Sequence, residues 1–346
     1  HTRSGRVTGV QRVLFRSLFN TIVKEAKAHP RDNYLVIVPE QFTMQTQRQL
    51  VDLSENKAIM NIDVLSFKRL AYRVFDELGI TNLTVLEETG KNLVLRKLAA
   101  QEADKLGVIG RNLNRIGYIS EVKSLLSELV QYNISPKELG RYIDSGRLSD
   151  TLSGKLKDVL VLYEAFEKFM QDKYITAEEI LNVLCNVAEE SAILRNSVIA
   201  FDEFTGFTPI QNQLIKKLFV ISKKIYVTLT IDCREDIFKS RGMQELFDMP
   251  TRTVKSLAEM AAFYGIEVEE PIILDKNYRL SENEELSFME QQLFRKRRCS
   301  FEKEPKHIHI DCLRDPKQEL TRIARKINEL VRNESLRYLD IAIVTG

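Results

Sequence analysis

The chain has 346 residues, a formal net charge of +2 and 44% hydrophobic residues, which is ordinary for a globular protein. Apolar runs stay short of the roughly 18 residues that cross a bilayer, and the first residues lack the apolar core of a secretory signal. The four cysteines are isolated from one another and form no CxxC pair, so neither a zinc site nor a disulfide framework is indicated. These features predict a cytoplasmic protein without membrane spans or a metal site.

Both ends of the chain are unusual. Val7–Ser17 resembles the conceptual translation of a sequencing-library adapter, so we interpret residues 1–17 as an assembly artefact and keep them out of the fold argument. A genuine amphipathic helix start is the alternative. At the other end, Asp340–Val344 has the pattern of a strand with nothing after it, although a strand needs partners. We therefore expect a piece of a longer protein.

Two strand-to-helix units follow the amino-terminal stretch. Tyr34–Pro39 and Ile59–Ser66 have the apolar, β-branched character of strands. Each precedes a segment of helical periodicity, Thr43–Leu53 and Phe67–Leu78. Successive units of this kind predict a parallel, doubly wound α/β sheet.

Residues 84–194 change character and show helical periodicity with almost no strand pattern. Their apolar stripes are most simply explained by packing into a common core. Ser135-Pro136 has the form of a helix start, with an N-cap followed by proline. The expected helices are Glu88–Leu106, Ile116–Tyr132, Lys137–Tyr142, Lys155–Asp172 and Thr176–Glu189.

The most informative segment begins with the apolar run Ser197–Phe201, which reads as a buried strand. Asp202 and Glu203 come where that strand ends, and Thr208-Pro209 then opens a helix. Paired carboxylates at the carboxyl end of a central strand are typical of Mg²⁺ sites in nucleoside triphosphatases. The alternative is a strand-to-helix loop whose acids are only solvated.

Strand and helix patterns alternate through the rest of the chain. The basic run Arg295–Arg298 fits a DNA-phosphate contact or, equally simply, a solvated helix end. The expected strands are Lys224–Asp232, Glu267–Leu274, Lys306–Leu313 and Asp340–Val344, and the expected helices are Glu282–Phe294 and Gln318–Arg332.

Four segments have an informative order and spacing: Leu35–Thr43 (LVIVPEQFT), Val64–Ala71 (VLSFKRLA), Asp202–Gln211 (DEFTGFTPIQ) and Val227–Asp232 (VTLTID). Together they resemble the amino-terminal part of the AddB subunit of bacterial AddAB helicase–nucleases, over most of residues 18–346. The resemblance implies an α/β fold with a RecA-like parallel sheet of the superfamily-1 helicase type and a large all-helical insertion. It implies a RecA-like domain in residues 18–83 and 195–300, an insertion in 84–194, and the start of a second α/β domain, truncated, in 301–346.

The resemblance also implies two sets of site residues. The nucleotide and Mg²⁺ set is Asp202, Glu203, Gln211 and Asp232. The set for single-stranded DNA is Gln41, Thr43, Ser66, Phe67 and Arg69. Strand-end amides and hydroxyls hold phosphates, and an aromatic ring stacks a base. For Phe67 the alternative is packing beneath the adjoining helix.

One feature departs from the helicase pattern. A phosphate loop of the form Gly-x-x-x-x-Gly-Lys-Ser/Thr should precede the first helix, and this sequence has none. Without it nothing holds the β- and γ-phosphates, so we expect no catalytic residue and no ATP hydrolysis in this chain. ATP and Mg²⁺ are expected in the intact parent, and an iron–sulfur cluster only in a carboxyl-terminal nuclease region absent from the sequence.

The function implied is DNA double-strand-break repair by homologous recombination, with this region as the helicase-like domain that binds and scans DNA. The implied partners are single-stranded DNA, duplex ends and an AddA-like helicase–nuclease subunit in a heterodimer. One alternative is a true superfamily-1 ATP-dependent DNA helicase whose phosphate loop was lost to the artefact. Another is a non-enzymatic helical adaptor whose α/β part is structural.

Overall fold

The computed structural model describes residues 11–81, 84–110, 116–146, 148–171, 174–232, 234, 236–240, 242–274, 280–293 and 299–345, without the side chains of residues 11–16 and 116. The basic run at 295–298 and Cys233 lie outside these residues. The chain divides into a larger compact unit, Thr21–Glu270, and a smaller one that contains residues 271–346 and the first twenty residues. Each unit is described by itself.

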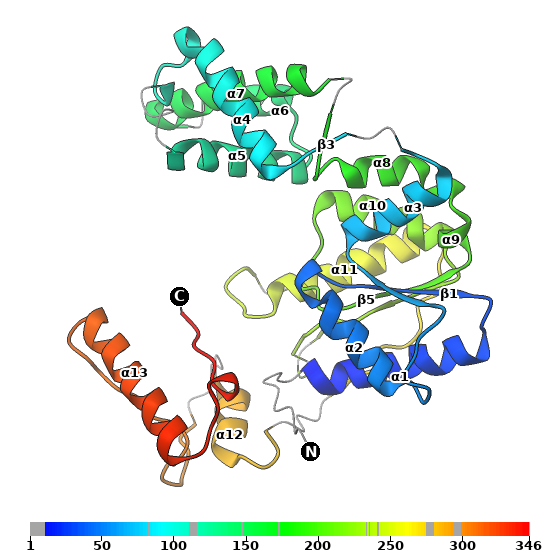
Figure 1. Ribbon diagram of the computed structural model, residues 1–346, viewed down its shortest axis with the longest axis vertical. Coiled ribbons are helices and arrows are strands. Elements are labelled where there is room, and N and C mark those ends of the chain that lie inside the picture. The colour runs from blue at the N-terminus through cyan, green and yellow to red at the C-terminus, as the bar shows by residue number, and fades with distance from the viewer. Residues whose placement is uncertain are drawn as a thin grey trace. The chain divides into compact units, whose positions relative to one another are not determined.

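A four-stranded parallel sheet organises the larger unit (Figure 1). Its strands are β1 (Asn33–Ile37), β2 (Ile62–Leu65), β5 (Ser197–Phe201) and β6 (Lys224–Val227), in the order β2-β1-β5-β6. All five residues of β5 are buried, as expected for a central strand covered on both faces. The predicted α/β fold with a parallel sheet is thus confirmed.

Helices cover both faces of this sheet, because alternate residues of each strand point to opposite sides. Leu35 and Ile37 of β1 pack into one core with α3, α8 and α10, whereas Tyr34 and Val36 are buried outside that core. Figure 1 shows α1 and α2 on the other face. The bounds of these elements are α1 (Gln11–Ala28), η1 (Glu40–Phe42), α2 (Thr43–Leu53), α3 (Phe67–Leu78), α8 (Ile180–Val187), η4 (Ala188–Glu190), α9 (Ala192–Arg195), α10 (Pro209–Ile221) and α11 (Asp248–Phe263).

A second core is entirely helical. It contains Leu95, Leu126 and Leu162 among its buried residues. The chain enters this region through β3 and leaves through β4, which pair in parallel as a two-stranded sheet. The elements are β3 (Val85–Leu86), α4 (Glu88–Gln101), η2 (Ala103–Lys105), α5 (Ile116–Gln131), α6 (Pro136–Asp144), α7 (Asp150–Met170) and β4 (Ile175–Thr176). Since α8 and α9 pack in the sheet core, the boundary of the insertion at residue 194 stays a prediction.

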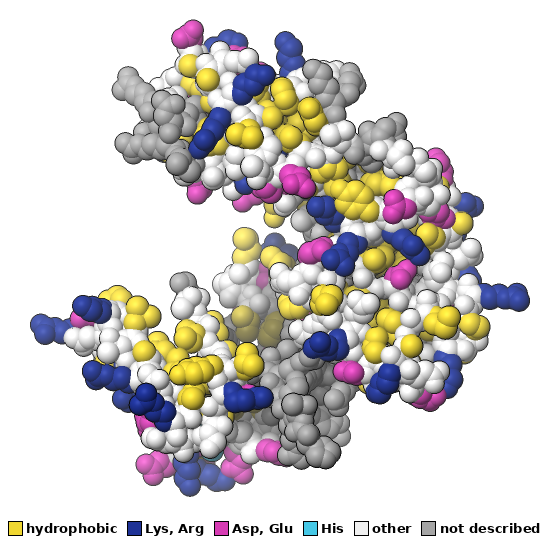
Figure 2. Space-filling view, viewed as in Figure 1, with side chains coloured by type: hydrophobic (Ala, Val, Ile, Leu, Met, Phe, Trp, Pro, Cys, Tyr) yellow, Lys and Arg dark blue, Asp and Glu magenta, His cyan; other side chains and the backbone are white. Residues whose placement is uncertain are grey.

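The smaller unit contains α12 (Glu284–Gln292), α13 (Pro316–Asn333) and the short η5 (Tyr338–Asp340). No residue of α13 is buried, and Figure 2 shows hydrophobic side chains on the surface of this unit. The predicted second α/β domain in residues 301–346 stays a prediction.

Three predicted strands are wrong. Residues 267–274, 306–313 and 340–344 are described and form no strand, and β6 ends at Val227 rather than at residue 232. A strand persists only where a neighbour takes its backbone hydrogen bonds. Ile310 and Val344 are each 93% exposed, so these segments have an apolar pattern without the burial that would make it a strand.

Candidate functional site

The carboxyl ends of the four parallel strands lie along one edge of the sheet. Backbone hydrogen bonds continue past the strand ends, from Val38 N–H to Leu65 O at 2.9 Å and from Asp202 N–H to Ile37 O at 3.0 Å. A third runs from Thr228 N–H to Phe201 O at 3.0 Å. The segments after β1, β2, β5 and β6 are therefore brought together, where open α/β sheets bind ligands.

Asp202 is the most deeply buried acid of this edge, with 0% of its surface exposed. Its Oδ1 accepts a hydrogen bond from the Thr228 hydroxyl, whereas its Oδ2 has no hydrogen-bond partner among the residues that the structure describes. Burial raises the pKa of Asp202 to about 6, against the lowering effects of the Thr228 hydrogen bond and of the Glu203 backbone. A buried carboxylate oxygen without a donor is suited to a cation or a protonated ligand.

Glu203 follows in an unusual backbone conformation, with φ at +65° in the left-handed region that favours glycine. The cost of that conformation for a residue with a Cβ is of order 1 kcal/mol or more. Burial, and then the charge of Asp202, raise the pKa of Glu203 to about 7. The two neighbouring carboxyl groups therefore ionise at higher pH than ordinary carboxyl groups do.

The other two residues predicted for the nucleotide site have local partners. Gln211 lies in a capping box at the start of α10: its Oε1 accepts from Thr208 N–H at 2.9 Å, and its own N–H donates to Thr208 Oγ1 at 3.4 Å. Asp232 forms an ion pair with Arg234 at 3.0 Å. Their nucleotide roles stay predictions.

Of the residues predicted to bind DNA, Gln41 and Arg69 are exposed. Arg69 Nε pairs with Glu40 at 3.1 Å, which joins the segment after β1 to the helix after β2. Thr43 is buried and donates its hydroxyl to Glu40 O at 2.9 Å. Ser66 is the N-cap of α3 and accepts from Arg69 N–H at 3.3 Å.

Phe67 is only 7% exposed and belongs to the sheet core. Its ring centroid lies 5.8 Å from that of Phe201, 5.5 Å from that of Phe204 and 6.4 Å from that of Phe207. In this arrangement the ring packs as the alternative interpretation expected. Its stacking on a base stays a prediction that requires the ring to leave the cluster.

Sequence reasoning missed two parts of this edge. Thr228 was within a recognised segment, but only the pairing of β6 with β5 shows that its hydroxyl reaches Asp202. Phe204 and Phe207 follow the acid pair closely, and their packing on Phe67 depends on the β2–β1–β5 order. The spacing of aromatic residues was the available signal.

Among the described residues no group of three or more His, Cys, Asp or Glu side chains is placed to hold a metal ion. No helix in the part of the chain that the structure describes has the length and apolar character of a membrane span.

Comparison with known proteins shows a consistent similarity. Residues 15–290 match the family model described as "ADDB, N-terminal". The chain is 37% identical over 334 residues to the B-subunit of the ATP-dependent helicase/deoxyribonuclease of Lachnoclostridium phytofermentans, covering 95% of this chain and 29% of that protein. The proteins of the same name from Clostridium tetani and Caldanaerobacter subterraneus subsp. tengcongensis are 30% and 32% identical, and the matches cover 95% and 90% of this chain but 29% and 27% of those proteins. The chain spans less than a third of the length of these relatives.

Proposed function

The chain belongs to the AddB amino-terminal family, and we therefore propose that it is the helicase-like, DNA-binding region of a helicase–nuclease subunit. The parent protein would act in double-strand-break repair by homologous recombination, in the cytoplasm, as a heterodimer with an AddA-like partner. The region's role would be to hold and scan single-stranded DNA. The observation that supports this most is the single edge formed by four parallel strand ends.

A RecA-like interpretation of the larger unit fits the order β2-β1-β5-β6 with helices on both faces. The DNA strand would lie over the segments after β1 and β2, where Gln41 and Arg69 are exposed. Arg69 would contact phosphate, since a guanidinium suits phosphate oxygens and its present partner Glu40 forms only a surface ion pair. Thr43 and Ser66 would position the two segments through the hydrogen bonds that they already make.

ATP and Mg²⁺ belong to the proposal for the whole protein. Asp202 supplies a buried oxygen without a hydrogen-bond partner from the described residues, and Glu203 lies beside it. One or two carboxylates completed by water and phosphate oxygens are a ligand set that Mg²⁺ accepts, so these residues fit the ion. When bound, the ion would neutralise phosphate charge.

The DNA-binding proposal is tested by fluorescence anisotropy with a labelled single-stranded oligonucleotide across a salt series. We expect weak binding that falls steeply with salt, because bound phosphates release counterions. Arg69→Ala should weaken binding to all sequences about equally, as a phosphate contact carries no base information.

Arg73→Ala is the matched control. Arg73 lies one turn further along α3, has a similarly exposed side chain and pairs with Asp63 at 3.7 Å. Equal losses of DNA affinity in the two variants would mean that only the total positive charge matters. A chain that shows no salt-sensitive DNA binding would refute the proposed DNA edge.

Two other functions remain as alternatives, a true superfamily-1 helicase and a non-enzymatic adaptor. Phosphate release with and without single-stranded DNA separates them. We expect no phosphate release, because the sequence lacks a phosphate loop. DNA-stimulated turnover that is lost in Asp202→Asn would show that the missing loop does not matter and that residues 1–17 are no artefact, which favours the helicase. The absence of both turnover and DNA binding would favour the adaptor.

A further inference from the structure

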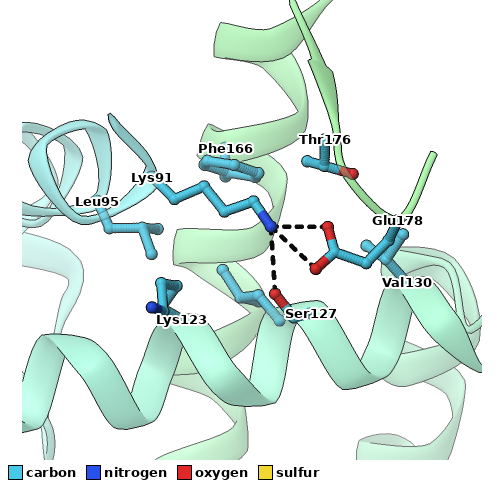
Figure 3. Close-up of a pocket in the computed structure, with 9 residues that line it drawn as sticks. Lys91, Leu95, Lys123, Ser127, Val130, Phe166, Thr176 and Glu178 are labelled. Carbon is cyan, nitrogen blue, oxygen red and sulfur yellow. Dashed lines mark hydrogen bonds and ion pairs between the residues drawn. The ribbon is translucent and has the colours of Figure 1, made fainter. Parts of the chain in front are cut away.

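A cluster of charged side chains is buried where the chain passes into and out of the helical core. We call this place the neck: β3 with the start of α4, and β4 with the turn before α8. Lys91 Nζ on α4 donates to both carboxylate oxygens of Glu178, at 2.9 and 2.7 Å, and lies 3.5 Å from the Ser127 hydroxyl of α5 (Figure 3). It also contacts Glu88 at 3.1 Å.

The surroundings of Lys91 are largely apolar. Its side chain is 3% exposed and that of Glu178 is 11% exposed. Leu95, Leu126 and Phe166 line the same cavity, whose volume is about 10 Å³. A cavity of this size holds about one water molecule and has no room for a larger ligand. We therefore interpret the charged cluster as structural rather than as a ligand site.

The ion pair connects parts of the chain that belong to different cores. Lys91 lies on a helix of the helical core, whereas Glu178 shortly precedes α8, whose Ile180 and Leu184 are buried in the sheet core. The chain runs between the two cores through β3 and β4, which have only two residues each. A two-residue ladder by itself resists bending poorly.

Stability alone does not explain a buried ion pair here. Desolvation consumes most of the Coulombic gain, and apolar residues of similar volume are often as stabilising. What this contact adds is a specific pairing, because Lys91 Nζ reaches both Glu178 oxygens only while α4 and the turn before α8 lie side by side. Burial by itself raises the pKa of Glu178, but the hydrogen bond and charge of Lys91 hold it below its ordinary value, so the Glu178 carboxylate is ionised at neutral pH.

We propose that the Lys91–Glu178 ion pair is a lock that fixes the neck to the helical core, so that the helical and sheet cores move as one body while it is closed. This role concerns motion within the larger unit and does not depend on DNA or nucleotide binding. Opening the lock leaves both cores folded and frees the connection between them.

Hydrogen exchange followed by mass spectrometry tests the lock in the double variant Lys91→Met/Glu178→Gln. The two replacements keep side-chain size and remove both charges, so no unpaired charge is left buried. We expect peptides that cover residues 84–90 and 174–179 to exchange at least about tenfold faster, including the Ile175 N–H that bonds Thr84 O at 3.0 Å. Peptides from β1 and β5 should exchange at the wild-type rate, with the melting temperature nearly unchanged.

Lys105→Met/Glu102→Gln is the matched control, because it removes an ion pair of 2.6 Å from the same helical region, where the Lys105 side chain is 68% exposed. It should leave neck exchange unchanged. Wild-type exchange of the neck in the Lys91/Glu178 variant would overturn the proposal. Faster exchange of the neck, β1 and β5 peptides by one common factor, together with a lower melting temperature, would also overturn it. In that case the ion pair would only stabilise the whole unit against unfolding.

Discussion

The buried carboxylates of Glu178 and Asp202, both in the larger unit, differ in the charge of the groups that they face. Glu178 faces the ammonium group of Lys91, which holds its pKa below the ordinary value in spite of burial. Asp202 faces neutral donors, the Thr228 hydroxyl and the Glu203 backbone, and its Oδ2 has no hydrogen-bond partner within the described residues, so burial raises its pKa to about 6. Compensation by charge thus separates a carboxylate that holds the scaffold from one that is suited to take a ligand.

The largest effect is expected when the compensating charge is removed. Lys91→Ala leaves Glu178 buried without its cation, and we expect the free energy of unfolding to fall by about 3–5 kcal/mol. Denaturant unfolding monitored by circular dichroism measures the loss. The pKa of Glu178 should then rise, because burial is no longer opposed by Lys91.

Lys27→Ala is the control for that loss. Lys27 pairs with Glu55 at 2.6 Å, but the two side chains are 69% and 80% exposed, so solvent screens the pair and we expect a much smaller loss. Similar losses in the two variants would contradict the importance given to burial.

The second test removes the charge that lacks compensation. The pKa of Asp202 rises from 3.8 to about 6 on folding, so at pH 8 its ionised form costs the folded state roughly 3 kcal/mol at most, at about 1.4 kcal/mol per pKa unit. Asp202→Asn should therefore raise stability at pH 8. At pH 4 the folded wild type is already protonated at this site, and the two proteins should be alike.

The sign of this pH dependence follows from linkage. A carboxyl whose pKa is raised on folding contributes stability that is fully present below its unfolded pKa and is lost as pH rises through its folded pKa. The wild type should lose stability between about pH 4 and pH 8, and the loss should shrink in Asp202→Asn. Melting curves at each pH measure it, and identical pH profiles would show that Asp202 is compensated in solution.

The smallest effect is expected when the Thr228 hydroxyl that donates to Asp202 is removed. Thr228→Val keeps the side-chain shape but removes a hydrogen bond to a charged group, worth about 1.5–3 kcal/mol. The loss should be largest above pH 6, where Asp202 ionises, and smaller at pH 4. Thr228→Ser retains the hydroxyl and should recover most of the pH-dependent part. A loss in Thr228→Val that is equal at all pH values would mean that only packing was disturbed.

Hydrophobic periodicity and capping residues predicted the helices and strands of the larger unit, because these signals depend only on residues close together in the sequence. Thr208 caps α10 and Pro209 begins it, as their positions before apolar periodicity indicate. The same signals failed for residues 306–313, where an alternating pattern is exposed and forms no strand. Alternation indicates which side chains would share a face, but pairing requires another strand.

Periodicity, caps and order along the chain were enough to predict the parallel α/β organisation, the helical region and the acid pair Asp202-Glu203 at a strand end. Which polar groups face one another depends instead on the tertiary fold. Thr228 reaches Asp202 because β6 pairs with β5, and Lys91 meets Glu178, 87 positions away, because α4 begins beside β4. Burial of Phe67 arises in the same way, from rings at the end of β5 and in the segment after it. Contacts between distant segments depend on strand order and helix packing, which residue spacing does not encode.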